Sequence, residues 1–574
     1  MRRQILITHI LLSSALILNA CGAENSQTAD LQAAPKVKVT TESSSSDAAT
    51  IAATGVTVPS APAETRKVEP ATTLGIAAEA VPGQSENFTS NIYPTQPANT
   101  ENYAHNDDNP IKRTAEDAVS TFSIDVDTGS YANLRRFLMN GQKPPADAVR
   151  VEEMLNYFSY AYKGPRDASI PFRADADVMT TPWNPNTKLL RLAIKGYQPP
   201  LDHRPAANLV FLIDVSGSMQ DQDKLPLLKA GMKMLVDQLG ADDKVTIVTY
   251  AGSAGLALAP TSGNEKETIR AAIDGLEAGG STAGGEGIAL AYAKAREAKV
   301  DGGINRILLA TDGDFNVGVT DIDALKDMIE ENRKSGIALS TLGFGEGNYN
   351  DALMEQIADV GNGSYGHIDS LNEAKRQLVD GLQANIETIA KDVKVQIEFN
   401  PAIVAEYRLI GYENRALKRE DFNNDQKDAG EIGAGHSVTA LYEIALIGSK
   451  GLSVDPLRYQ DEGTAKGVAG KAEEFAFLRI RYKAPGGDAS KLIETPLPTA
   501  WLSRDKETTP DDNFAAAVAA FGQYLKGGDR LGQFDLGQIA SLARSGRGED
   551  ASGERAEFIN LVELTEALAP TQNR

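Results

Sequence analysis

Residues 208–218 read NLVFLIDVSGS and combine a strand pattern with a loop of small polar residues. Its first six residues are almost all apolar, with β-branched and aromatic side chains, which is typical of a parallel strand buried on both faces. Asp214 follows at the carboxyl end of that strand, and a short turn then carries Ser216 and Ser218. From 225 to 239 apolar residues recur every three or four positions, which predicts an amphipathic helix. Ligands bind at such strand ends in open α/β sheets, so we expect a site in this loop.

The alternation of strand and helix continues downstream. Apolar runs predict further strands at 245–250, 255–259, 306–310, 338–344 and 363–368. Amphipathic patterns between them predict helices at 265–276, 285–298 and 321–334, and a last, long helix is predicted from about Ser370 onward. Strands that alternate with helices in this way indicate a doubly wound α/β fold, with a mostly parallel sheet covered by helices on both faces.

The loop after the first strand offers only carboxylate and hydroxyl oxygens. Hard cations such as Mg²⁺ and Ca²⁺ prefer these ligands, so Asp214, Ser216 and Ser218 are candidate metal ligands. Short Asp/Ser loops also occur as plain helix caps, which is the alternative interpretation.

These residues resemble the metal-ion-dependent adhesion site of the von Willebrand factor A (VWA) domain, whose pattern is Asp-x-Ser-x-Ser. Asp214, Ser216 and Ser218 match that pattern without a gap. The family adds a threonine from a glycine-rich loop, for which Thr282 is the candidate, and an aspartate after a later strand, for which Asp312 is the candidate.

The resemblance implies a six-stranded, Rossmann-like VWA domain at 207–389, with Ser281 as a less favoured substitute for Thr282. It also implies a divalent metal, with Mg²⁺ favoured over Mn²⁺ or Ca²⁺ because few carboxylates are present. In adhesive relatives the last helix of the domain moves when ligand binds, so 378–389 is the candidate switch.

The flanking segments have different patterns. Residues 114–200 predict a small α+β segment, with strands at 120–127, 172–179 and 188–197 and helices at 130–139 and 149–158. Residues 390–574 predict an antiparallel β-rich region followed by helices at 513–525, 536–543 and 554–568. Both segments resemble the extensions of a subset of bacterial VWA lipoproteins. Asp125 and Asp127 lack the rest of a calcium-binding loop, so we interpret them as a solvated strand end.

The N-terminus predicts export and lipidation. Residues 1–20 begin with two arginines and continue with a short apolar run, as in a signal peptide. Leu18 to Cys21 resembles the lipobox of bacterial lipoproteins, and Cys21 is the only cysteine among 574 residues. Gly22 after that cysteine favours the outer over the inner membrane. Residues 21–113 are poor in large apolar residues and predict a disordered tether, whose span would be roughly 50 Å.

Composition and motifs exclude several classes of function. The chain has 57 Lys and Arg against 79 Asp and Glu, a net charge of −22, which disfavours nucleic acid as a partner. It contains no Gly-x-Ser-x-Gly elbow, no His-Glu-x-x-His and no second cysteine, so we expect no enzyme activity. The glycines of 343–347 lack the rest of a nucleotide-binding fingerprint and predict a turn.

The resulting hypothesis is a lipid-anchored protein of the cell envelope. Its VWA domain would hold a divalent metal that is completed by a carboxylate from a protein partner. One alternative is an envelope scaffold or assembly lipoprotein whose metal site is mainly structural. Another is a metal-dependent accessory to an ATPase or secretion system.

Overall fold

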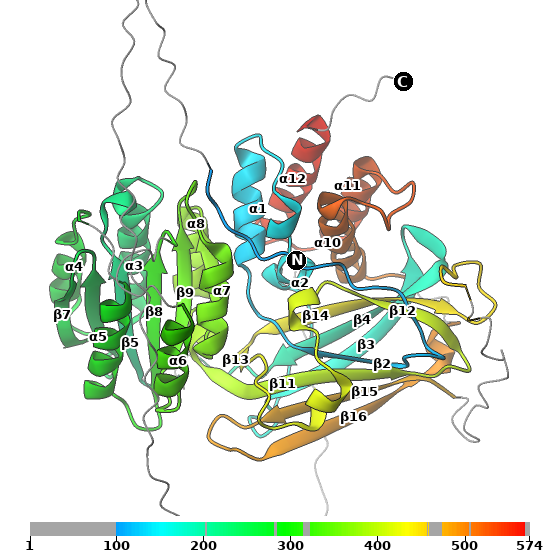
Figure 1. Ribbon diagram of the computed structural model, residues 1–574, viewed down its shortest axis with the longest axis horizontal. Helices are drawn as coiled ribbons and strands as arrows, with labels where there is room; N and C mark the ends of the chain where they lie inside the picture. Colours follow the sequence, from blue (N-terminus) through cyan, green and yellow to red (C-terminus); the bar gives the residue numbers. More distant parts are fainter. Residues whose placement is uncertain are drawn as a thin grey trace, which may run out of the picture. The chain divides into compact units, whose positions relative to one another are not determined.

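The structure is a computed structural model that describes residues 99–200, 204–280, 284–313, 322–455, 457, 473–503 and 507–568. Its central feature is a six-stranded sheet in the order β10-β9-β8-β5-β6-β7 (Figure 1). Every neighbouring pair is parallel except β6 and β7. The strands are β5 (Ala207–Asp214), β6 (Lys244–Tyr250), β7 (Ala254–Ser262), β8 (Ile304–Thr311), β9 (Ala338–Phe344) and β10 (Tyr365–Ile368). This confirms the predicted mostly parallel sheet of six strands.

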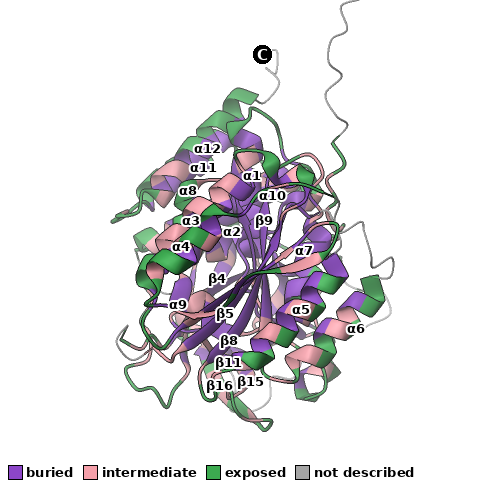
Figure 2. Ribbon diagram, turned by 90° about the vertical axis from the view of Figure 1, so that its left-hand side faces the viewer, coloured by how far each residue is buried: buried purple, intermediate pink, exposed green. Residues whose placement is uncertain are grey.

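Helices cover both faces of this sheet because strand β5 is apolar on both sides. Leu209 and Phe211 pack with α3 (Leu225–Gln238), α4 (Lys266–Asp274) and the final helical segment. Val210 and Leu212 point to the opposite face and pack with α5 (Gly284–Glu297), α6 (Ile322–Arg333) and α7 (Asp351–Val360). Figure 2 shows the buried strands between helices whose outward sides are exposed. The doubly wound arrangement is therefore confirmed as well.

The final helical segment differs from the single long helix that the sequence predicts. It consists of α8 (Leu371–Lys375), one π-helical turn (Arg376–Asp380) and α9 (Leu382–Ile386). Strand β11 begins two residues after α9, so the candidate switch at 378–389 crosses from this broken helix into a strand.

The segments before and after the VWA region share two β-sheets. One has the order β1-β12-β14-β4-β3, and the other runs β13-β11-β15-β16 with β2 also paired to β11. Their shared core lies between the two sheets and includes Leu192 of β4 and Ile397 of β11. The strands are β1 (Lys112–Arg113), β2 (Val119–Ser123), β3 (Phe172–Thr181), β4 (Asn184–Gly196), β11 (Thr388–Phe399), β12 (Val404–Ile410), β13 (Ile432–Gly433), β14 (Ser437–Leu446), β15 (Glu474–Lys483) and β16 (Ser490–Pro498).

Segments 114–200 and 390–574 therefore contribute strands to the same two sheets. Strand β2 pairs with β11, and β4 pairs with β14, so strands from before and after the VWA region are hydrogen-bonded within the same sheets. The helices associate in the same way: α1 (Gly129–Met139) and α2 (Val151–Tyr157) share a core with α10 (Pro510–Lys526), α11 (Leu536–Ser545) and α12 (Glu554–Leu568). Short 3₁₀ turns complete the fold at Ala146–Ala148, Gly217–Gln220, Glu413–Arg415, Arg419–Asn423 and Thr499–Trp501.

Buried ion pairs join this composite region to the VWA sheet. Arg415 contacts Asp125 at 3.4 Å, Asp127 at 3.1 Å and Glu355 of α7 at 3.2 Å. All four side chains are at most one-tenth exposed. The interpretation of Asp125 and Asp127 as a solvated strand end was therefore wrong, because a buried arginine compensates both carboxylates.

The fold also begins earlier than the predicted boundary at residue 113. The backbone N–H of Thr100 donates to Gly347 O at 2.7 Å, and that of Asn102 donates to Tyr349 O at 2.9 Å. Glu101 pairs with Arg136 of α1 at 3.0 Å. These contacts are polar. The tether prediction depends on the low content of large apolar residues, which gives no information about polar contacts. The rest of the predicted tether lies outside the described residues.

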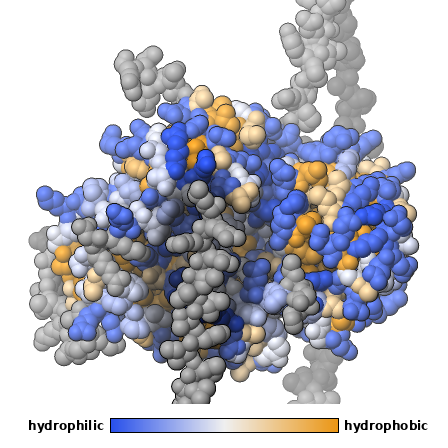
Figure 3. Space-filling model, turned by 180° about the vertical axis from the view of Figure 1, so that it is seen from behind, coloured by the Kyte–Doolittle hydropathy of each residue, from blue (hydrophilic) through white to orange (hydrophobic). Residues whose placement is uncertain are grey.

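Among the described residues, no helix is long and apolar enough to cross a membrane. Hydrophilic residues cover most of the face shown in Figure 3, with smaller hydrophobic patches between them. The large exposed apolar side chains are spread along the chain from Met139 to Leu568.

Candidate metal centre

The predicted loop residues gather at the carboxyl end of β5. Asp214 is fully buried, and its Oδ1 accepts a hydrogen bond from the Ser216 N–H at 2.8 Å. Its Oδ2 accepts from the Thr311 hydroxyl at 2.9 Å. The hydroxyl oxygens of Ser216 and Ser218 lie 3.0 Å apart. The backbone turn therefore brings one carboxylate and two hydroxyls together within a single loop.

Asp312 reaches the same place from the neighbouring strand. Strand β8 runs parallel to β5, with Ala310 opposite Ile213, so the residues that follow both strands emerge side by side. Asp312 is fully buried. Burial raises the pKa of Asp214 to about 6, and the nearby Asp312 carboxylate also raises it. Two buried carboxylates that repel each other favour a cation between them.

The glycine-rich loop closes over the other side of the serines. Gly217 N–H donates to Gly280 O at 3.1 Å, and Gly279 N–H donates to Val215 O at 2.7 Å. Gly280 has a φ of +89°, which favours glycine at that position. Ser281 and Thr282 follow directly and lie outside the described residues, so their placement stays a prediction.

The donor set fits a hard divalent cation. It consists of carboxylate and hydroxyl oxygens, which Mg²⁺ and Ca²⁺ prefer. Mg²⁺ usually keeps several water ligands, so these few protein oxygens are enough for it. Among the described residues, no three or more His, Cys, Asp or Glu side chains come together as a metal site. A metal at this loop would therefore depend on the serine hydroxyls as much as on the two carboxylates.

Two residues at this site were missed by the sequence interpretation. Thr311 holds Asp214 through its hydroxyl, and Lys224 places its ammonium 3.1 Å from Asp312 Oδ2. A signal for Lys224 was present, because a lysine at the start of a helix opposes the helix dipole and therefore needs a compensating partner.

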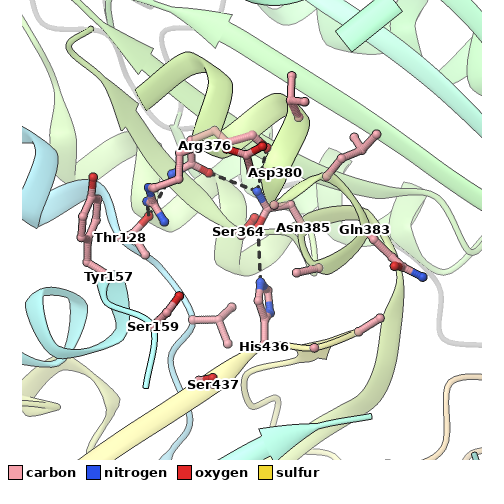
Figure 4. A pocket seen from close by; sticks show the side chains of 18 of the residues that line it. Thr128, Tyr157, Ser159, Ser364, Arg376, Asp380, Gln383, Asn385, His436 and Ser437 are labelled. Carbon is pink, nitrogen blue, oxygen red and sulfur yellow. Dashed lines mark hydrogen bonds between the residues drawn. The ribbon is translucent and has the colours of Figure 1, made fainter. Parts of the chain in front are cut away.

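A separate cavity of about 1070 Å³ lies at the seam between the VWA region and the β-rich region. Figure 4 shows side chains from both regions lining it. The Arg376 guanidinium donates to the Thr128 hydroxyl at 2.8 Å, and His436 Nε2 lies 3.3 Å from Asn385 Oδ1. Of the predicted metal ligands that the structure describes, Asp214, Ser216, Ser218 and Asp312, none lines this cavity, so it is distinct from the loop that holds them.

Family models match three parts of the chain. The model described as "von Willebrand factor type A domain" matches residues 208–381, and one described as "von Willebrand factor" matches 97–191. A model described as "Uncharacterized protein YfbK, C-terminal" matches 384–568. The fold and the strand-end loop therefore define a VWA domain protein. Such domains generally mediate interactions between proteins and commonly use a divalent metal to do so.

Relatives extend over most of the chain. YfbK of Escherichia coli (strain K12) is 49% identical over 477 residues, which cover 82% of this chain and 82% of YfbK. The protein sll0103 of Synechocystis sp. is 26% identical over 366 residues, covering 61% of this chain and 82% of that protein. The solved von Willebrand factor type A structure from Catenulispora acidiphila has 16% identity and a TM-score of 0.39, and covers 71% of this chain and 91% of that one. The chain belongs to the YfbK family of VWA domain proteins.

Proposed function

We propose that this protein is a lipid-anchored protein of the cell envelope that captures a protein partner through a divalent metal at the VWA loop. The observation that supports this most is the convergence of Asp214, Ser216, Ser218 and Asp312 from two adjacent strand ends. A partner would complete the metal with a carboxylate.

The proposed ligands have different roles. Following the family, Ser216 and Ser218 would bind the metal directly through their hydroxyls, and Thr282 directly or through water. Asp214 and Asp312 would ligate directly or orient metal-bound waters, as residues around a metal commonly do. We propose Mg²⁺ as the ion, because it keeps part of its water shell and needs fewer protein oxygens than Ca²⁺. The bound ion would supply positive charge for an acidic group of the partner.

The anchor completes the proposal. Lipidation at Cys21 would place the folded region at a membrane, with the outer membrane favoured over the inner one. We propose no enzyme activity, since the residues at the centre are accounted for as metal ligands and their supports.

The test is metal binding by Asp214→Asn. This change removes the charge. The amide oxygen can still accept from the Ser216 N–H, and the amide N–H can donate to the Thr311 hydroxyl, so the fold should persist. We expect calorimetric titration with Mg²⁺ or Mn²⁺ to show binding by the wild type and at least a tenfold loss in the variant. A tenfold loss corresponds to about 1.4 kcal/mol.

The matched control is Asp274→Asn. Asp274 is more than half exposed and pairs with Lys233 on the protein surface, so the same chemical change should leave metal binding intact. Cross-linking in intact cells should then capture a partner with the wild type and the control but not with Asp214→Asn or after EDTA. Equal metal affinity in Asp214→Asn and the wild type would contradict the proposal.

A further inference from the structure

Lys224 is a buried cation within the candidate metal centre. It is the residue before α3, its side chain is 6% exposed, and its ammonium pairs with the fully buried Asp312 at 3.1 Å. Burying a charge is unfavourable, and the start of a helix carries partial positive charge of its own. Both effects disfavour a lysine here, so the Asp312 carboxylate has to offset them.

The loop after β9 is shaped to admit this lysine. A Cβ atom at Gly345 would stand 2.2 Å from Lys224 Cε and 2.8 Å from Lys224 Cγ. Gly345 also has a φ of +75°, a conformation that favours glycine. Of the three glycines at 343–347, Gly345 is the one that stands against Lys224. It leaves space for the lysine stem beside the metal loop.

The geometry points to Lys224 as a resident cation of the centre that weakens divalent-metal binding and leaves a bound metal more attractive to a partner's carboxylate. This inference rests on the proposed function. The two carboxylates and the ammonium together carry one negative charge, so a divalent ion leaves one positive charge in the site. Without Lys224 the same site would be neutral after metal binding and would hold an acidic partner less strongly.

Electrostatics gives the size of the expected effect. Coulomb's law illustrates the scale: at a separation of about 6 Å, a unit positive charge weakens the binding of a divalent ion about tenfold even at the dielectric constant of water, and by more in a buried site. The ammonium also uses the Asp312 oxygen to which the ion or one of its waters would otherwise bond. Both effects act in the same direction.

The experiment compares the affinity of Mn²⁺ for the wild type and Lys224→Met by calorimetry. Methionine fills much of the lysine stem's volume without its charge. We expect Lys224→Met to bind Mn²⁺ at least about tenfold more tightly. Lys224→Arg keeps the charge and should stay near the wild type. Lys229→Met removes the same charge from the first part of α3. In the part of the chain described, Lys229 donates only to the carbonyls of Asp274 and Leu276, so this variant should bind Mn²⁺ as the wild type does.

The outcomes separate this inference from the proposed function. If the wild type binds Mn²⁺ and Lys224→Met binds it equally or more weakly while remaining folded by circular dichroism, the role of Lys224 is overturned and the metal site stands. If neither binds Mn²⁺, the proposed function fails and this inference fails with it. Should Lys224→Met not fold, Lys224→Gln removes the charge but can still donate to Asp312, and the same comparison decides.

Discussion

His367 is a buried histidine on β10 with no hydrogen bond to either ring nitrogen among the described residues. Its ring packs edge-on against Tyr349, with centroids 4.9 Å apart. Burial lowers the pKa of His367 to about 3, and the nearby Arg136 guanidinium also lowers it. The folded protein therefore holds this imidazole in its neutral form.

This histidine should make the folded state sensitive to acid. The unfolded chain takes up the proton near pH 6.5, whereas the folded protein takes it up only near pH 3. The contribution of His367 to stability is therefore complete above pH 6.5 and is lost as the pH falls toward 3. From pH 7 to pH 5 the loss should be about 2 kcal/mol. His367→Phe keeps the aromatic contact and should lack this loss, as measured by urea unfolding at both pH values.

His105→Phe is the contrasting variant. His105 is exposed, and its hydrogen bond to Asp147 raises its pKa, so its small contribution should increase, not decrease, on acidification. If wild type and His367→Phe lose stability equally between pH 7 and pH 5, the assignment of a neutral buried histidine is wrong.

At the residue level, the pattern of residue types indicates chemistry that is local in the chain, whereas Asp312 was assigned to the site through the family resemblance. Asp214, Ser216 and Ser218 are two residues apart, so one turn suffices to bring them together. Arg415 neutralises Asp125 and Asp127 from almost three hundred positions away, and no local pattern indicates that pairing. For this reason the two aspartates could only be interpreted as solvated.

Among the elements, the sequence interpretation missed β16 and α7, for different reasons. β16 is an edge strand that includes Pro496 and Pro498, and proline argues against a strand except at an edge, where it blocks no ladder hydrogen bond. Helix α7 is only ten residues long, although its apolar spacing at Leu353, Met354 and Ile357 was visible. Long, strongly periodic elements such as α3 and α5 were predicted correctly.

The break in the last helical segment has a local cause. At Gly381 a Cβ would stand 2.8 Å from Arg376 O, so the backbones approach closely there. The Asn385 side chain donates to Gln377 O at 2.9 Å and replaces a helical hydrogen bond. The spacing of apolar residues does not depend on which group accepts or donates these hydrogen bonds. For this reason the sequence predicts an uninterrupted helix.

The contact of α1 with β10 should depend on Gly129. A Cβ at this position would stand 2.2 Å from Tyr365 Cε1, and Tyr365 is fully enclosed. At an unconstrained helical position alanine is favoured over glycine by about 1 kcal/mol. Here the steric overlap with Tyr365 should outweigh the higher helix propensity of alanine, so Gly129→Ala should destabilise the protein by about 1–3 kcal/mol.

Urea unfolding would measure this change, and faster hydrogen exchange at β10 would locate it. The control is Gly486→Ala, because among the described residues no atom beyond its chain neighbours lies within 4 Å of a Cβ at that position. A Gly129→Ala protein as stable as the wild type, with unchanged exchange at β10, would show that α1 can shift without cost.

At the scale of the whole chain, the VWA region is inserted into a composite β and helical region. Thr121 of β2 and Gln396 of β11 are hydrogen-bonded although 275 positions separate them. The residue pattern of each segment predicts a strand, but it does not indicate which other strand pairs with it. The sequence therefore predicts the inserted sheet, in which all neighbouring strands except β5 and β8 follow one another along the chain, but not the pairing of the flanks.

The proposed membrane anchor belongs to the scale of the whole chain, because it would hold every domain at the membrane. Cys21 is the only cysteine, so Cys21→Ala removes the proposed lipidation site completely. One acyl chain alone gives only marginal, reversible membrane binding, so a stable anchor requires additional acyl groups. We expect the variant to lose fatty-acid labelling and to move from washed membranes to the soluble fraction. Ser26→Ala, a change in the same stretch that keeps the thiol, should remain with the membranes.

Cys21→Ala should also bind Mn²⁺ as the wild type does, because the metal loop lies within its own folded sheet. If Cys21→Ala sediments with the membranes, either no lipid is attached at Cys21 or another contact holds the protein there, and the anchor proposed here is wrong.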